Sequence, residues 1–246
     1  MRLRRPLILF ILLLVACGDI VSPPTLPPTP TPLTFTPLDE LLGRNMPLAG
    51  AEITTVGYVV VDAAGARLLD GMSFSAGEAP QPLPGIGRVW LGTEIVRSLG
   101  GLLQRTGGVR YSVVVARGRL QGPGVFGPDG SYRYQLNDPR LQTLTHEETS
   151  ISALLDNAAA YEGRLVRVAG GLLARKDSAL LVEQLGTGGL PAPGTRQIKL
   201  RGPLQDVALL GRLKRTSNSA IHFGQVQIEG FWRAGQLAPL AILPIT

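Results

Sequence analysis

The segment TVGYVV at residues 55–60 has a counterpart later in the chain, VAGGLL at residues 168–173, at an offset of 113 residues. In each segment apolar residues flank one matched glycine, Gly57 in the first and Gly170 in the second. A short apolar run is typical of a buried β-strand, and a glycine inside it marks a bend or the close approach of another backbone. The pair therefore indicates two related β domains in one chain.

Four further pairs of segments repeat at nearly the same offset. They comprise a helical lead-in, a second strand, a third strand and a fourth strand, matched as 38–42 with 151–155, 67–69 with 180–182, 88–91 with 197–200 and 109–118 with 221–230. Agreement over so many segments predicts a duplicated domain of about 100 residues, which is an ordinary domain size. We therefore expect a first domain at residues 38–145 and a second at residues 146–246.

Each copy is expected to contain three strands, a helix and two more strands. In the first copy the expected strands lie near 52–61, 66–75, 86–91, 109–119 and 131–136, and the helix lies near 94–104. In the second copy the expected strands lie near 163–174, 179–185, 195–201, 220–233 and 236–243, and the helix lies near 203–213. The predicted fold class is mainly β, with two tandem five-stranded Greek-key barrels and one helix between the third and fourth strands of each.

This order of elements resembles the OB-fold, and the glycines Gly57 and Gly170 suit the sharp bend of a first strand in such a barrel. The resemblance implies a barrel whose outer face on the second and third strands can carry an oligonucleotide or an oligosaccharide. It rests on element order and on two glycines, without a specific motif. An SH3-like or another small barrel is the alternative.

The amino terminus has the pattern of an export signal. Three arginines, Arg2, Arg4 and Arg5, precede an apolar run at residues 6–16, which is shorter than the roughly 20 residues of a membrane-spanning helix. The residues LVAC at 14–17 resemble the lipobox of bacterial lipoproteins. The resemblance implies a signal peptide at residues 1–16, cleavage before Cys17, diacylglycerol on the Cys17 thiol, and a further acyl chain such as palmitate on the new amine.

Cys17 is the only cysteine of the chain, so an exported form has no internal disulfide available. A buried thiol inside a signal sequence is the alternative interpretation of this residue. Residues 17–37 are rich in proline and threonine, and such a segment favours an extended spacer between the lipid and the folded domains. A proline-rich ligand for a partner domain is the alternative interpretation of this linker. We expect an extracytoplasmic protein, held by lipid to the cell membrane, or to the outer membrane if the cell has one.

The candidate ligand-binding residues lie on the third strand of each copy. Because side chains alternate between the two faces of a strand, Val89 and Leu91 are expected to face the first core, and Ile198 and Leu200 the second. The opposite faces then present the candidate ligand-binding residues, which are Arg88, Trp90, Lys199 and Arg201. A cation beside an aromatic ring suits stacking on a base or a sugar. A solvated basic strand, with the tryptophan covering the neighbouring domain, is the alternative.

The sequence provides little for catalysis. Its only histidines are His146 and His222, and the HEE segment at residues 146–148 lacks the histidine spacing of a zincin helix. A Gly-x-Ser-x-Gly elbow and a Walker-type loop are both missing from the sequence. We therefore expect no catalytic residue, no cofactor and no metal ion, with an unrecognised hydrolase as a minor alternative.

The net charge argues only weakly for nucleic acid. The chain carries +6, and three of the positive charges belong to the signal arginines. We therefore expect a non-enzymatic binding module for a partner protein or an extended polymer, either an oligosaccharide or, with weaker support, a nucleic acid. A purely structural element of an envelope complex, in which the barrels serve as a spacer, is the alternative.

Overall fold

A computed structural model gives the fold of the chain. It describes residues 34–43, 50–74, 80–83, 87–95, 99, 103–204, 206–216 and 221–245. These residues belong to one compact unit, which begins at Pro32. The expected signal peptide, Cys17 and most of the linker lie outside the described residues, as does most of the helix expected near 94–104. In the described part, no helix combines the length and the apolar composition needed to cross a bilayer.

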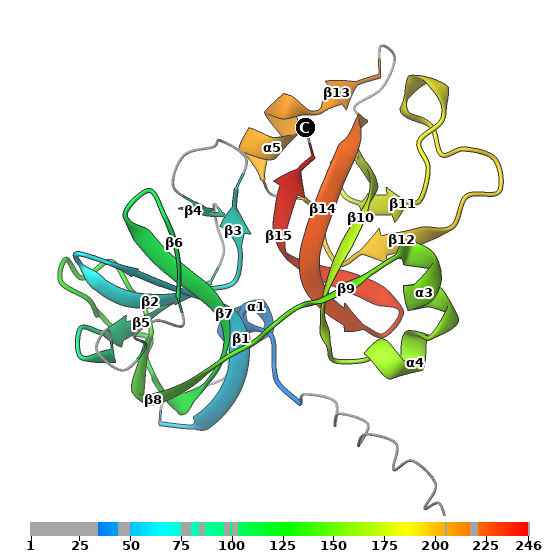
Figure 1. Cartoon of the computed structure of the whole chain (residues 1–246). Helices are drawn as coiled ribbons and strands as arrows, with labels where there is room; N and C mark the ends of the chain where they lie inside the picture. Colours follow the sequence, from blue (N-terminus) through cyan, green and yellow to red (C-terminus); the bar gives the residue numbers. More distant parts are fainter. Residues whose placement is uncertain are drawn as a thin grey trace, which may run out of the picture. The chain divides into compact units, whose positions relative to one another are not determined.

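The first barrel consists of five strands that close on themselves (Figure 1). Their bounds are Glu52–Asp62 for β1, Gly65–Leu69 for β2, Arg88–Gly92 for β5, Val109–Gln121 for β7 and Gln135–Thr143 for β8. They are hydrogen-bonded in the order β1-β2-β5-β8-β7, and β7 pairs back to β1. Neighbouring strands are antiparallel except for the parallel pair β5 and β8. Helix α1 (Leu38–Gly43) precedes this barrel, and the short strand β6 (Gln104–Thr106) pairs with β7.

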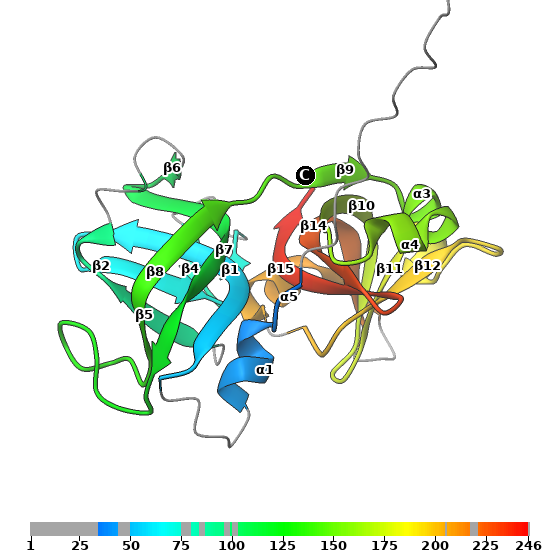
Figure 2. The same cartoon turned by 90° about the horizontal axis from the view of Figure 1, so that it is seen from below.

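The second barrel repeats this arrangement. Its strands are β10 (Leu165–Ala174), β11 (Ala179–Val182), β12 (Gln197–Leu200), β14 (His222–Arg233) and β15 (Gln236–Pro244), closed in the order β10-β11-β12-β15-β14. Its shorter elements are β9 (Glu147–Thr149), α3 (Ile151–Asp156), α4 (Ala158–Tyr161), the 3-10 turn η2 (Thr187–Gly189), α5 (Val207–Arg212) and β13 (Lys214–Arg215). After β8 the chain crosses into β9, which lies parallel to β10 (Figure 2). The prediction of two small five-stranded barrels is confirmed.

The strand register matches the internal repeat. Gly57 on β1 lies opposite Val114, and Gly170 on β10 lies opposite Val226. A Cβ atom at Gly57 would lie 2.5 Å from the carbonyl oxygen of Leu69 on β2. A Cβ atom at Gly170 would likewise lie 2.8 Å from a carbonyl oxygen on β11. Both glycines therefore allow a neighbouring strand to approach more closely than any side chain permits.

The fifth strand of the first copy was predicted too early. Residues 131–136 were expected to form it, but β8 begins at Gln135 and extends to Thr143. In the second barrel a two-residue turn at Ala234 and Gly235 joins the last two strands, whereas residues 122–134 form a long loop in the first barrel. An isolated bridge between Phe126 and Tyr132 closes this loop on itself. Residues 131–134, which were expected to begin the strand, belong to this loop instead, whose extra length has no counterpart in the second copy.

The second strand of the first copy was predicted too long. A strand was expected near 66–75, but β2 ends at Leu69. The next strand, β3 (Met72–Ser73), does not pair within the first barrel but pairs in parallel with β15 of the second barrel. The short strand β4 (Gln81–Pro82) pairs in turn with β3. The sheet of the second barrel thus includes two short strands, β3 and β4, from the first half of the sequence. Assigning strands one by one from the sequence does not reveal this pairing.

A third hydrophobic cluster joins the two barrels. On β1, Val59 and Val61 face the core of the first barrel, whereas Val56, Tyr58 and Val60 face this shared cluster. The second barrel contributes Leu165, Phe231, Leu240 and Ala241. Both faces of β1 are therefore buried, which accounts for its nearly continuous apolar sequence.

Candidate functional site

A cavity of about 710 Å³ lies between the two barrels and is lined by residues of both. Its volume falls within the range of roughly 300–1,000 Å³ that is usual for small-molecule sites. From the first barrel, α1, the end of β2, the start of β5 and the end of the 122–134 loop line it. From the second barrel, the segment after β12 and the β14–β15 turn region contribute. The cavity therefore depends on the packing of one barrel against the other.

Aromatic rings form part of the cavity wall. Phe35, just before α1, packs against Phe231 of β14 with 4.7 Å between the ring centroids. The guanidinium of Arg233 lies 4.9 Å from the centre of the Phe35 ring, which is the geometry of a cation–π contact. Tyr132 and Tyr134, from the end of the 122–134 loop, line the cavity as well. Phe35 thus connects the beginning of the described chain to the second barrel.

Ion pairs attach α1 to the second barrel. Arg201, which follows β12, donates a hydrogen bond to the carboxylate of Glu40, and its Nη2 lies 4.0 Å from a carboxylate oxygen of Asp39. The hydrogen bond from Arg201 to Glu40 raises the pKa of Arg201 above its usual value. Because Glu40 and Asp39 belong to α1, these contacts help to hold the helix over the cavity.

Asp70 is a partly buried carboxyl group at the cavity, immediately after β2. Burial raises its pKa to about 7, and the nearby charge of Asp39 adds to this, whereas Arg201 opposes it. Its backbone N–H donates a hydrogen bond of 3.2 Å to the carbonyl oxygen of Gly87. At neutral pH this side chain can therefore donate or accept a hydrogen bond in the cavity.

We expect Asp70→Asn to stabilise the protein more strongly as the pH rises. Below about pH 4 the carboxyl of Asp70 is protonated in both the folded and the unfolded chain, so it causes no loss of stability. The Asp70 carboxyl ionises near pH 4 in the unfolded chain but only near pH 7 in the folded chain. Between these pH values the wild type therefore loses stability, by about 2–4 kcal/mol in total, and above pH 7 it loses no more. Denaturant unfolding at pH 4, 6 and 8 measures this difference. The exposed Asp177→Asn is the control, and an equal effect of both variants at every pH would contradict the burial of Asp70.

Two of the four predicted ligand-binding residues line the cavity. Arg88 is exposed at the start of β5, and Arg201 follows β12. Lys199 is exposed on β12 but does not line the cavity. The alternation that placed these residues is correct, because Val89 and Ile198 are buried in their barrels.

Trp90 lies on the outer face of its strand, but its ring is not exposed for stacking on a ligand. It is only 7 % exposed, and its ring lies 5.2 Å from that of Tyr132 in the 122–134 loop. A Cβ atom at Gly65 would lie 2.5 Å from the Trp90 ring, so the turn between β1 and β2 closes over it from another side. The four predicted residues therefore do not form one continuous groove. The loop that covers Trp90 is the segment that the second copy lacks.

Several residues at the cavity escaped the sequence analysis. Arg133 belongs to the 122–134 loop, for which the internal repeat offers no counterpart. Arg233 lies at the end of β14, and Asp70 lies just after β2. A single arginine or aspartate at the end of a strand is common on any protein surface. These residues differ from ordinary surface residues only because the folded protein brings them together at the cavity.

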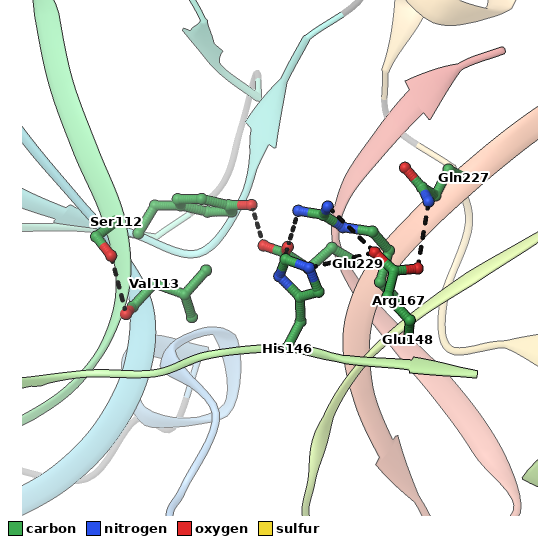
Figure 3. A network of polar contacts seen from close by, with 8 residues as sticks. Ser112, Val113, His146, Glu148, Arg167, Gln227 and Glu229 are labelled. Carbon is green, nitrogen blue, oxygen red and sulfur yellow. Dashed lines mark hydrogen bonds and ion pairs between the residues drawn. The ribbon is translucent and has the colours of Figure 1, made fainter. Parts of the chain in front are cut away.

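A second group of polar residues does not line this cavity and comprises Tyr58, His146, Glu148, Arg167 and Glu229. We call it the interbarrel network, and Figure 3 shows it from close by. Glu229 on β14 accepts hydrogen bonds from the Tyr58 hydroxyl, at 2.5 Å, and from Arg167 Nη2, at 2.8 Å. The Nδ1 atom of His146 lies 3.1 Å from the same carboxylate, and His146 Nε2 lies 3.3 Å from Glu148. The network thus joins β1 of the first barrel to the segment between the barrels and to the second barrel.

The chemistry of the interbarrel network is that of a structural contact. Burial raises the pKa of Tyr58 well above its usual value, and the charge of Glu229 adds to this effect. The Tyr58 hydroxyl therefore stays protonated and donates to Glu229. Glu229 is 4 % exposed and its carboxylate is surrounded by donors, so it has little capacity for a ligand. Among the described residues, no cluster of His, Cys, Asp and Glu side chains has the arrangement of a metal site.

The role of the cavity has to be inferred from its own residues. No protein-family model matches the chain, no curated protein matches its sequence, and no solved structure matches its fold. The arginines, the carboxyl groups and the aromatic rings of the cavity are therefore the basis for its function.

Proposed function

We propose that this chain is a non-enzymatic binding module whose ligand occupies the cavity between the two barrels. The observation that carries this proposal is the cavity itself, to which both barrels contribute guanidinium groups and aromatic rings. A few polar groups around a concave, partly apolar space are typical of ligand sites. The binding site then exists only in the folded, two-barrel form, which gives the domain duplication a function.

The proposal includes a lipid anchor outside the cytoplasmic membrane. The residues LVAC at 14–17, behind a short apolar run, support cleavage before Cys17 and lipid on its thiol. Two or three acyl chains anchor a protein stably, because each buried CH₂ contributes about 0.8 kcal/mol. The proline-rich segment that follows then acts as a spacer. Mass spectrometry of the mature protein tests this part, because the amino-terminal residue should be a diacylglyceryl cysteine.

We also propose that each barrel is of the OB type. The closed order β1-β2-β5-β8-β7, its repetition in the second barrel, and one parallel pair between the third and fifth strands support this. OB-folds use the face of their second and third strands for ligands. In the first barrel of this chain, Trp90 on the third strand is covered by its own loop, and the binding site is instead the cavity between the barrels.

A purely structural element is the second candidate function. The interbarrel hydrophobic cluster, the pairing of β3 with β15 and the interbarrel network all favour two barrels that are held rigidly together. Such a body suits a spacer in an assembly at the cell envelope. Under this alternative, stable partner proteins are retained on the chain and substitutions at the cavity leave their binding unchanged.

We expect the double variant Arg88→Ala and Arg133→Ala to weaken ligand binding by about tenfold to a hundredfold for each arginine removed, because hydrogen bonds to charged groups contribute about 1.5–3 kcal/mol each. Both arginines are exposed at the cavity, so the fold should tolerate their loss. Binding to arrays of glycans and of single-stranded oligonucleotides measures the effect. The matched control is Arg117→Ala with Arg119→Ala, which removes two exposed arginines of β7 that do not line the cavity. Equal binding by both double variants would argue against this site.

A further inference from the structure

We infer that the ligand of the cavity is a saccharide that carries carboxylate groups, such as a uronic-acid oligosaccharide; this inference rests on the proposed function. Three features of the cavity support this ligand class: the arginines that form no ion pair with described residues, the acidic and aromatic groups beside them, and the volume.

The arginines of the cavity suit a carboxylate. Within the described residues, neither Arg88 nor Arg133 nor Arg233 forms an ion pair, whereas Arg201 is already held by α1. The Nη1 atom of Arg233 is buried and has no hydrogen-bond partner in the described part of the chain. The planar fork of a guanidinium matches the two oxygens of a carboxylate and forms two parallel hydrogen bonds with it.

The acidic groups of the cavity argue against a nucleic acid. Asp39 and Asp70 line the same space as the arginines. Proteins that bind single-stranded nucleic acid follow the closely spaced phosphates with a continuous positively charged groove. Carboxylates in this cavity would repel the phosphates, and they would repel a ligand carboxylate as well, so a ligand that fits places its acidic group on the arginines and uncharged groups beside Asp39 and Asp70. The hydroxyl groups of a sugar, in contrast, donate hydrogen bonds to carboxylates and accept them from protonated carboxyl groups.

Aromatic walls favour a sugar over a small inorganic anion. Tyr132, Tyr134 and Phe231 line the cavity together with the arginines. The apolar C–H face of a pyranose ring packs on an aromatic face, which carries partial negative charge. Phe231 already packs on Phe35 and is 2 % exposed, whereas Tyr132 and Tyr134 are partly exposed, and a free phosphate or sulfate would use the arginines but not these two tyrosines. Saccharides combine an apolar face with polar edges, as this cavity does.

The volume of the cavity limits the length of the bound segment. About 710 Å³ accommodates a drug-sized ligand, which corresponds to roughly two sugar units. A longer polymer would leave the cavity at both ends. The anchored protein would then hold one short segment of an acidic polysaccharide at a time.

The test is calorimetric titration of the purified full chain with three probes of matched length. They are an acidic trisaccharide chosen from an array of uronate-containing and sialylated glycans, the same trisaccharide with its carboxyl groups reduced to alcohols, and a thymidine trinucleotide. We expect the acidic trisaccharide to bind at least tenfold more tightly than the other two. The double variant Arg88→Ala and Arg133→Ala should lose at least tenfold in affinity, and Arg117→Ala with Arg119→Ala should bind like the wild type.

The possible outcomes separate this inference from the proposed function. Equal binding of the reduced trisaccharide, or tighter binding of the trinucleotide, would overturn the inferred ligand class, while sensitivity to the cavity variant would preserve the cavity as the site. Binding that the cavity variant leaves unchanged would overturn the site itself. If no acidic glycan on the array bound above the neutral glycans, the inference would be wrong. Recovery of a cleaved probe would contradict a non-enzymatic function.

Discussion

Replacing Glu229 with alanine is expected to lower the free energy of unfolding by about 2–4 kcal/mol, because it removes the acceptor of two hydrogen bonds, one of them an ion pair with the partly buried Arg167. The Glu229 carboxylate accepts a hydrogen bond from Tyr58 in the first barrel and another from Arg167 in the second. Without it, the Tyr58 hydroxyl remains buried and loses its acceptor, and the partly buried guanidinium of Arg167 keeps only its contact with Glu148. The two barrels then lose the main polar contact that accompanies their shared hydrophobic cluster.

Denaturant unfolding of the purified chain measures this effect. The matched control is Asp156→Ala, which breaks the exposed pair between Asp156 and Arg196, where solvent screens the charges. We expect the control to leave the midpoint of unfolding almost unchanged. Tyr58→Phe, which keeps the Glu229 charge and removes one donor, should cost about 1–3 kcal/mol. If Glu229→Ala were no more destabilising than Asp156→Ala, the interbarrel network would not hold the barrels together.

Alanine at Gly230 is expected to destabilise the protein by about 2–3 kcal/mol or more, because the added methyl group has no space. A Cβ atom there would lie 2.3 Å from the carbonyl oxygen of Ala238 on β15 and 2.9 Å from its carbonyl carbon. Both are backbone atoms of a paired strand, so they cannot turn aside as a flexible side chain can. The register of β14 and β15 also shifts between Glu229 and Gly230, which places this glycine at an irregularity of the barrel.

The control for this variant is Gly211→Ala in α5, where an added Cβ atom meets nothing within 4 Å. Alanine is favoured over glycine in a helix by up to about 1 kcal/mol, so this control should be neutral or stabilising. Gly118 in the first barrel occupies the matched position and approaches the carbonyl oxygen of Asn137, at 2.6 Å from its ideal Cβ. We expect Gly118→Ala to resemble Gly230→Ala in thermal unfolding experiments. A Gly230 variant as stable as the Gly211 variant would contradict the close approach of β15.

Much of the fold could be predicted because the information is local and occurs twice. The alternation at Val89 and Leu91, repeated at Ile198 and Leu200, correctly identified the core side of the third strands. The matched glycines correctly identified the tight places in the barrels. The errors lie where the two copies differ, at the loop 122–134 and after Leu69. A repeat gives no guidance for a segment that only one copy contains.

The candidate site was only half predictable. Arg88 and Arg201 were found because they extend the alternating pattern of the third strands. Arg133 and Arg233 were missed because each lies next to a turn, where periodicity ends. The same alternation also selected Trp90, which a loop covers, and Lys199, which lies outside the cavity. Periodicity reports which face of a strand a side chain occupies, but it does not report what covers that face.

The amino-acid sequence determined the two barrels, because strand alternation and matched glycines are encoded within a few neighbouring residues. The lipid anchor, which rests on a terminal signal outside the described residues, stays a prediction. The cavity and the interbarrel network arose from the packing of β1, β7, β14 and β15 around a shared apolar cluster. That packing brings together Tyr58 and Glu229, which are 171 residues apart in the chain. Contacts at such a separation depend on the burial of whole surfaces, and no local pattern of residues specifies them.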